Sequence, residues 1–238
     1  MDSLKVEIFK LDPSLWQIIL IRRAQMLFAM SKGRKECLVG ISVLLLLVVA
    51  GCMSTKNAEK HQTAVPFSKS QFNGKSIAIL PVSEAKTSFA TESNRGLRLA
   101  VSEALDNKAT KLIATAKMSK YKMCATTLND ANKLNLLDEL FKTYEVTGTY
   151  DNKTVVALCD TLNADYLIVS KLTAGKLDAI LTKATTLTLD VSIVSKQTKE
   201  VVWGGTGTFR KGGIMGFGGV DDKEVAEELV NLAFSNFE

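Results

Sequence analysis

The cysteine at position 52 is the side chain whose surroundings most clearly favour a chemical modification. It directly follows Val49-Ala50-Gly51, so two small residues stand before it. Small residues let a peptidase bring its catalytic groups close to the backbone, and a thiol at the next position can carry a thioether-linked diacylglycerol. The sequence therefore predicts cleavage before Cys52 and lipid attachment to its sulfur.

The residues before Cys52 have the layout of an export signal. Leu38–Val49 is an almost unbroken apolar run, and the basic segment Lys32–Lys35 precedes it. This order is typical of a secretory signal peptide, whereas a spanning helix needs about 20 apolar residues. The Val-Ala-Gly-Cys sequence resembles the bacterial lipobox, which implies a lipoprotein signal peptide over residues 30–51. An uncleaved membrane anchor and a buried apolar segment are the alternatives.

Residues 1–29 do not fit this scheme, because a signal peptide should begin near its basic segment. Met30 would provide a normal start, followed by Ser-Lys-Gly-Arg-Lys. We therefore interpret residues 1–29 as an upstream extension from a misassigned start. Within it, Leu15–Arg23 could form a weak amphipathic helix.

Residues 52–74 form a polar, aperiodic stretch after the lipid site. This pattern predicts a flexible tether, followed by a globular domain over residues 75–238. The only histidine of the chain, His61, lies in the predicted tether. A catalytic or metal-binding histidine needs a rigid, supported environment, so we interpret His61 as a solvated side chain.

A glycine-rich segment, Lys211–Gly219, lies between an expected strand and an expected helix, which raises the hypothesis of a phosphate loop. It lacks the Gly-Lys-Ser/Thr ending of such a loop and the glycine spacing of a dinucleotide site. We interpret it as a flexible connection. Its apolar side chains Ile214, Met215 and Phe217 are a candidate contact with a partner or a membrane.

Two further cysteines, Cys124 and Cys159, would remain after cleavage before Cys52. An oxidising envelope would permit a disulfide between them. However, Cys159 lies on an apolar helical face, where buried free thiols are common. The sequence leaves both states open.

The globular part carries no set of residues typical of catalysis or metal binding. With one histidine, in the tether, it cannot assemble a serine-histidine triad, and no Gly-x-Ser-x-Gly elbow occurs. No Cys-x-x-Cys pair or histidine cluster favours a metal, and Asp221-Asp222 is better interpreted as the start of a helix. We therefore expect no catalytic residue, no metal and no cofactor.

The net charge of +5 gives no support to nucleic-acid binding. Seven of the 30 basic residues and four of the 25 acidic residues precede Cys52, so the remainder has an excess of only two basic residues. A nearly balanced domain with 7% aromatic residues lacks the features that bind phosphate backbones and stack on bases. We expect no nucleic-acid partner.

Hydrophobic periodicity predicts an α/β (α+β) domain with a single mixed sheet covered by helices. Buried strands are expected at 76–80, 111–115 and 166–169, and a hairpin at 186–193 and 200–203. Helices are expected around Leu97–Leu105 and Leu134–Phe141, from an Asp151 cap to Leu162, and from Asp221 to about Phe234. In the hairpin, alternation predicts one face on the core and one in water.

Three segments together resemble a group of envelope proteins that share the fold of the amino-terminal domain of the Tol translocation protein TolB. They are Ile77–Val82, Leu162–Val169 and Val191–Trp203. The resemblance covers about residues 75–238. The group includes the curli-secretion channel lipoprotein, the lipoprotein of Pel polysaccharide export and lipoprotein activators of penicillin-binding proteins.

The chain also departs from this group. It has Ser170 where the group often has glycine, and Thr198-Lys199 where the group often has a Thr-Gly turn. Curli channels need long amphipathic hairpins, with alternation over about ten residues in each strand. The stretch 174–185 looks too short and too charged for this, so a channel-forming role is not expected.

The signal and the resemblance together imply an outer-membrane lipoprotein anchored through Cys52, with its domain in the periplasm. Met53-Ser54 supply no aspartate of the kind that commonly retains lipoproteins in the inner membrane. We expect a non-enzymatic interaction, assembly or regulatory component of export or cell-wall machinery, with an envelope protein as partner. The resemblance also allows a homo-oligomer.

The alternative is a periplasmic lipoprotein that binds a small ligand or a glycan in a pocket beside the sheet. A deep polar cleft would favour this alternative, whereas a flat contact surface would favour the interaction protein.

Overall fold

The computed structural model describes residues 55–60, 67–84, 93–178, 183–213 and 221–237. The chain divides into two units, Met1–Met53 and Ser54–Glu238, and every described residue lies in the second. The predicted signal peptide, Cys52 and His61 lie outside the described residues. Among the residues that are described, no helix is long and apolar enough to cross a membrane.

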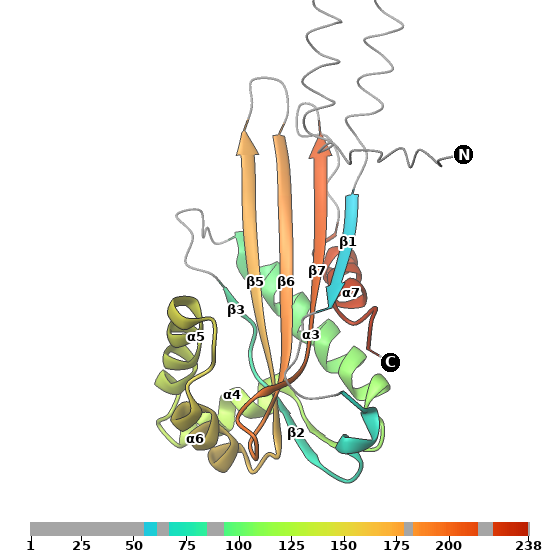
Figure 1. The fold of residues 1–238 in the computed structure, drawn as a ribbon. Coiled ribbons are helices and arrows are strands. Elements are labelled where there is room, and N and C mark those ends of the chain that lie inside the picture. The colour runs from blue at the N-terminus through green and yellow to red at the C-terminus, as the bar shows by residue number, and fades with distance from the viewer. Residues whose placement is uncertain (1–54, 61–66, 85–92, 179–182, 214–220, 238) are drawn as a thin grey trace, which may run out of the picture. The chain divides into compact units, whose positions relative to one another are not determined.

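A seven-stranded mixed sheet forms the centre of the second unit (Figure 1), as the sequence predicted. The strand order is β1-β7-β6-β5-β2-β4, and β3 pairs with β5 beside this path. The pairs β1–β7, β7–β6 and β6–β5 are antiparallel. The pairs β5–β2, β2–β4 and β3–β5 are parallel. The strands are β1 (Thr55–Lys60), β2 (Ser76–Ile79), β3 (Ser83–Glu84), β4 (Lys117–Ser119), β5 (Tyr166–Asp178), β6 (Lys183–Ser195) and β7 (Val201–Gly213).

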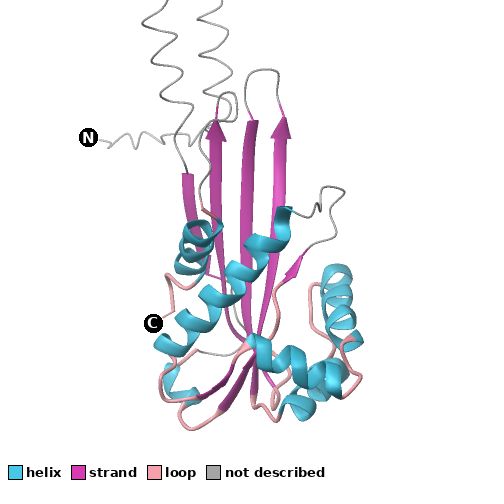
Figure 2. Ribbon diagram, turned by 180° about the vertical axis from the view of Figure 1, so that it is seen from behind, coloured by secondary structure: helices cyan, strands magenta, loops and turns pink. Residues whose placement is uncertain are grey.

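Helices cover the two faces of the sheet unequally (Figure 2). The described α-helices are α3 (Ser93–Leu112), α4 (Tyr121–Asp130), α5 (Asn135–Thr147), α6 (Asn152–Leu162) and α7 (Asp222–Ala233), with a short 3-10 helix η1 (Lys69–Phe72). Helices α3 and α7 lie along one face. Helices α4, α5 and α6 lie at the end of the sheet where β2 is located (Figure 1). The outer halves of β5, β6 and β7 are the halves farthest from β2. On the face opposite α3 and α7, no described helix covers these outer halves.

The alternation of side chains along the strands produces two hydrophobic cores. The first lies under α3 and α7 and includes Leu172, Leu189, Val191 and Trp203. The second lies under α4, α5 and α6 and includes Leu167, Val169 and Val194. Because successive residues of a strand point to opposite faces, β5 contributes to both cores.

Two glycines of β7 let α7 pack directly on the sheet. A Cβ atom on Gly205 would clash with the carbonyl oxygen of Ala233, and one on Gly207 would clash with that of Leu229. Both oxygens belong to the backbone of α7, which cannot move aside as a side chain can. The glycines therefore set the distance between the helix and the sheet.

Two aspartates cap helices, of which the sequence predicted Asp151 as a cap and Asp221 as a negative charge at the helix start. Asp151 precedes α6, and its carboxylate accepts hydrogen bonds from the backbone N–H of Thr154 at 2.8 Å and from the Thr154 hydroxyl at 2.9 Å. Asp221 precedes α7 and accepts from the backbone N–H of Lys223 at 3.2 Å. Each carboxylate satisfies a backbone donor that the first helical turn leaves unpaired.

The expected strand at 111–115 is wrong. Helix α3 continues through Leu112, and Ile113, which directly follows it, is buried together with Ala109, so this run is the end of a helix. The strand that follows is β4, at Lys117–Ser119. Helix α4 was missed, although Tyr121, Cys124 and Leu128 are buried at helical spacing.

The expected flexible tether is also wrong over much of its length. Residues Thr55–Lys60 form the edge strand β1, which pairs antiparallel with β7 from Thr55↔Arg210 to Lys60↔Gly205. Phe72 is fully buried, and the Phe67 ring lies 5.0 Å from that of Phe237. Backbone pairing thus holds residues 55–60, and two aromatic side chains anchor residues 67–72, although the polar composition of both stretches had suggested a spacer.

The predicted hairpin is confirmed, but its strands are much longer than expected. β5, β6 and β7 have 13 residues each. The stretch 174–185, judged too short and charged for a long hairpin, pairs β5 with β6 as far as Asp178↔Lys183. The sheet therefore extends well beyond its two cores.

Candidate interaction surface

One face of the outer half of the sheet carries only polar side chains. These side chains alternate along the strands with the core residues Leu172, Leu189 and Phe209, so they point away from α3 and α7. All of them are exposed or partly exposed. We call this set the open face: Asn57, Glu59, Lys171, Thr173, Thr186, Thr188, Asp190, Thr206, Thr208 and Arg210.

The strand register arranges the open face in rows. Thr173, Thr188, Thr208 and Asn57 form one row across β5, β6, β7 and β1. The next row consists of Lys171, Asp190, Thr206 and Glu59 in the same strand order. Threonine favours strands because its branched Cβ fits a pleated surface, so this composition also supports the strands that carry it.

Hydrogen bonds and an ion pair hold several of these side chains in place. The Thr206 hydroxyl donates to Asp190 Oδ1 at 2.6 Å, and the hydroxyls of Thr188 and Thr208 lie 3.4 Å apart. Lys171 Nζ lies 3.0 Å from Glu145 Oε1 on α5. The open face is therefore an ordered polar surface before any partner binds.

Two tyrosines mark the border where α5 meets the sheet. The rings of Tyr144 and Tyr150 stack with centroids 4.5 Å apart and planes at 17°. Burial raises the pKa of Tyr150, and its hydrogen bond with Ser192 opposes that rise. Ser192 alternates with the core residues Val191 and Ile193 in the strand expected at 186–193, which puts it on the face expected in water, but it is 3% exposed. That expectation fails at Ser192, where Tyr150 covers the strand, and holds for the partly exposed Thr186 and Thr188.

Two hollows lie at the edges of the described structure. One, of about 240 Å³, is lined by Lys75, Asp165, Tyr166, Ser195, Lys196 and Gln197. The other, of about 670 Å³, lies between the α5–α6 loop and the β6–β7 turn, and its lining includes Thr147, Tyr150, Asp151 and Lys199. Both are open to solvent, so neither is the deep polar cleft that the alternative function would require.

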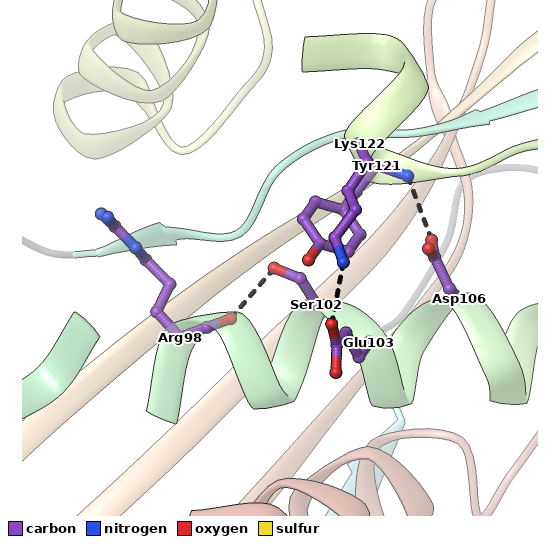
Figure 3. Close-up of polar contacts among 6 residues, drawn as sticks. All are labelled: Arg98, Ser102, Glu103, Asp106, Tyr121 and Lys122. Carbon is purple, nitrogen blue, oxygen red and sulfur yellow. Dashed lines mark hydrogen bonds and ion pairs between the residues drawn. The ribbon is translucent and has the colours of Figure 1, made fainter. Parts of the chain in front are cut away.

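Polar residues between α3 and α4 form a second cluster, which is structural (Figure 3). Lys120, which precedes α4, makes no capping bond through its side chain. Asp106 on α3 instead accepts a hydrogen bond from the backbone N–H of Tyr121 at 3.1 Å. Burial raises the pKa of Asp106, and the Tyr121 hydrogen bond opposes that rise.

Neighbouring contacts complete this junction. Lys122 Nζ lies 3.0 Å from Glu103 Oε1, on the exposed side. The Ser102 hydroxyl donates to the carbonyl oxygen of Arg98 at 3.0 Å, within α3. Each contact joins the two helices or closes a helical turn, so the cluster fixes the position of α4 (Figure 3).

The structure has Cys124 and Cys159 as free, buried thiols in the second core, so the disulfide that the sequence left open is not formed there. Burial raises the pKa of each thiol to about 12. A thiol in this state is protonated at neutral pH and reacts slowly.

The other residues singled out from the sequence are not brought together. Cys52 and the apolar trio Ile214, Met215 and Phe217 lie outside the described residues. Within the described ranges, no group of three or more histidine, cysteine, aspartate or glutamate side chains could hold a metal ion. The open face itself was only half anticipated: the threonines of β6 were expected in water, whereas those of β7 were missed although Thr206 and Thr208 alternate in the same way.

Comparison with known proteins gives structural likeness alone. No protein-family model matches the chain, and no curated protein matches it. The PelC dodecamer from Paraburkholderia phytofirmans is 14% identical, with 77% of this chain and 96% of that chain covered and a TM-score of 0.38. Lipoprotein GNA1162 from Neisseria meningitidis is 15% identical, with 68% of this chain and 97% of that chain covered and a TM-score of 0.38. The LpoB C-terminal domain from Escherichia coli is 12% identical, with 58% of this chain and 83% of that chain covered and a TM-score of 0.33.

The resemblance expected from the sequence is thus confirmed as a distant similarity of structure to PelC, GNA1162 and LpoB. At this distance the similarity describes a shared arrangement of helices and strands and assigns no role to any residue.

Proposed function

We propose that this chain is a lipid-anchored protein of the bacterial cell envelope that binds a protein partner through the open face and has no catalytic role. The Val-Ala-Gly-Cys sequence at Cys52 supports the anchor. The observation that carries the binding role is the open face, a polar surface built from four strands and left uncovered by the described helices.

The shape of the open face favours a macromolecular partner. Four strands at about 4.8 Å spacing, with two or three open-face positions along each strand, give a surface of roughly 20 by 15 Å. Small-molecule sites are concave and enclose most of their ligand, whereas no open-face residue lines either of the two hollows described above. One side of a standard protein interface buries about 800 Å², so the partner would also contact neighbouring elements such as α5.

The charges of the open face favour a protein over a polyanion. Lys171 and Arg210 are basic, Glu59 and Asp190 are acidic, and these charges are interspersed among threonines. Nucleic acids and other polyanions require a predominantly basic surface. A partner with its own mixture of charges and hydroxyl groups matches this pattern, and export or cell-wall machinery offers such proteins in the envelope.

The test is a lipid-preserving pull-down from envelope extracts, with partners identified by mass spectrometry. Thr188→Arg and Thr208→Arg each place a long charged side chain in the threonine row, so we expect the wild-type partner to be lost. Thr110→Arg is the matched control, because Thr110 is an exposed threonine on α3, on the opposite side of the sheet. Circular dichroism and thermal unfolding check that all variants fold.

Two results would contradict the proposal. Equal partner recovery from Thr188→Arg, Thr208→Arg and wild type would exclude the open face as the binding surface. If the protein and its Cys52→Ala variant fractionate identically, the lipid anchor is wrong.

The second candidate is a small-ligand or glycan-binding lipoprotein, whose ligand would lie in the open hollow of about 670 Å³. This volume is within the usual range for ligand sites, and Thr147, Asp151 and Asn152 supply polar groups to its lining. Titration with soluble glycan fragments, followed by nuclear magnetic resonance, would reveal it. Shifts confined to the α5–α6 loop and β6–β7 turn would favour this candidate over the open face.

A further inference from the structure

One row of the open face has a base at one end and an acid at the other. In the row of Lys171, Asp190, Thr206 and Glu59, the lysine lies on β5 and the glutamate on β1, with β6 and β7 between them. Glu59 is exposed and Lys171 is partly exposed. A row with opposite charges at its two ends can pair with a copy of itself after a twofold rotation.

The strand register defines that rotation. A twofold axis parallel to the strands, placed above the gap between β6 and β7, exchanges β6 with β7 and β5 with β1 (Figure 1). The rotation keeps the position along the strands, so each row would face the same row of a second copy. Lys171 would then face the second copy's Glu59, and Thr188 would face its Thr208. In such an interface every contact occurs twice.

The other simple face-to-face arrangement pairs no opposite charges. Its twofold axis is perpendicular to the strands and passes over the row of Thr188 and Thr208, so each strand would face itself. Asp190 would then face Thr186 of the second copy, and Thr206 would face Arg210. Lys171 would have no acid directly opposite it. Charge complementarity therefore favours the axis that is parallel to the strands.

The side chains fit the space between two packed sheets. Sheets that pack face to face lie about 10 Å apart, a gap that a lysine and a glutamate can bridge from opposite sides. The residues nearest the axis, Thr188 and Thr208, are short and leave the two copies free to approach. Lys171 pairs with Glu145 at 3.0 Å, but an ammonium group has three donors and can also bind the second copy's Glu59.

Helix α5 would enlarge the contact. The open face alone supplies roughly 300 Å² on each copy, whereas one side of a standard interface buries about 800 Å². Figure 1 shows α5 beside β5, on the side away from β6. The rotation places the second copy's β1 opposite β5, so α5 would border that strand, and the same contact would recur on the other side of the dimer.

We infer that the partner of the open face is the open face of a second copy of this chain, related by a twofold axis parallel to β6 and β7. This inference rests on the proposed binding role of the open face and names the partner that the role requires. Lys171 and Glu59 form the charged contacts of the dimer, one pair at each side of the axis.

The first test uses complementary charge reversals in the full lipidated protein, with the mass of the assembly measured by sedimentation in density-matched detergent. Glu59→Lys would put a lysine opposite Lys171, and Lys171→Glu would put a glutamate opposite Glu59, so each variant alone should lose the dimer. An equimolar mixture should regain it, because the two variants match each other at both contacts. Glu200→Lys, the same change in the exposed turn between β6 and β7, is the matched control and should stay dimeric.

A second measurement leaves the charges unchanged, because Lys171→Glu also removes the ion pair with Glu145. Thr188→Cys and Thr208→Cys proteins are mixed and treated with a short thiol cross-linker, and peptide mass spectrometry identifies the linked positions. Links between positions 188 and 208 should exceed their statistical share over 188–188 and 208–208 links. Cys124 and Cys159 are buried and react little.

A monomeric wild type overturns the inference, and so does a mixture of folded charge variants that stays monomeric. A statistical distribution of cross-links overturns it as well. The envelope pull-down separates this failure from that of the proposed function. If Thr188→Arg loses a different envelope protein while the wild type is monomeric, the open face keeps its binding role and the second copy is wrong. If neither a second copy nor another protein depends on the open face, both proposals fail.

Discussion

At the scale of single residues, Asp151 is the polar side chain whose contribution to stability is most directly testable. It supplies the N-cap of α6 through two hydrogen bonds to Thr154. Loss of such a cap costs about 1 kcal/mol, so Asp151→Ala should lower the free energy of unfolding by that amount. Urea denaturation measures it, with Asp138→Ala in the first turn of α5 as control. A change no larger than that of the control would show that the cap is not stabilising.

Asp165 should make stability depend on acid pH. It accepts hydrogen bonds from the backbone N–H and the hydroxyl of Ser76, and these hold its pKa below the ordinary value of 3.8. A lowered pKa in the folded state contributes stability above the ordinary pKa, and this contribution is lost as the pH falls through the folded value. Asp165→Asn should therefore weaken the loss of stability below pH 3.8. Unfolding curves between neutral and acid pH test this, and parallel curves for both proteins would contradict it.

The two described cysteines should behave as inert core residues. Their thiols are buried, and burial raises the pKa of each to about 12. We expect iodoacetamide at neutral pH to leave both unmodified in the native protein and to modify both in urea. Peptide mass spectrometry distinguishes the two sites. Rapid native labelling of either cysteine, or a disulfide-linked peptide, would contradict the structure.

At the scale of elements, the packing of α7 on β7 depends on the absence of a side chain at Gly205. A Cβ there would meet the α7 backbone and the Trp203 ring. Adding atoms to a packed core typically costs about 1–3 kcal/mol, so Gly205→Ala should lower the free energy of unfolding by about that amount. The control is Gly96→Ala in α3, where the new Cβ would lie 2.8 Å from Asp222 Oδ2, the end of a side chain that can turn away. Thermal unfolding of both variants measures the difference. Similar melting temperatures would mean that α7 can shift at little cost.

Elements with a marked apolar pattern were predictable from the sequence. Leu189, Val191 and Ile193 alternate and are buried in β6, and the Asp151 cap placed the start of α6 correctly. β1 gave no such signal, because its side chains Lys56–Glu59 are exposed and its pairing with β7 uses only the backbone. The outer half of β5 was missed for a related reason: pairing with β6 extends it beyond the cores, where no apolar pattern is required.

At the scale of the whole molecule, the open face emerges only when four strands are placed side by side. Asn57 and Thr173 are far apart in the sequence, and β1, which carries Asn57, was not expected to be a strand. The residue types alone could therefore indicate one wet strand but not the surface. The same strand, β1, begins three residues after Cys52, so the proposed lipid site and the proposed binding surface lie close together in the sequence.

The most direct test of the central claim is site-specific photo-crosslinking in living cells, with a photoreactive residue in place of Thr188 on the open face or Thr110 on α3. The account predicts a crosslink to one envelope protein from Thr188, none from Thr110, and loss of the Thr188 crosslink when Thr208→Arg is added. If Thr188 gives no protein crosslink, or Thr110 gives the same one, the open face is not the partner-binding surface.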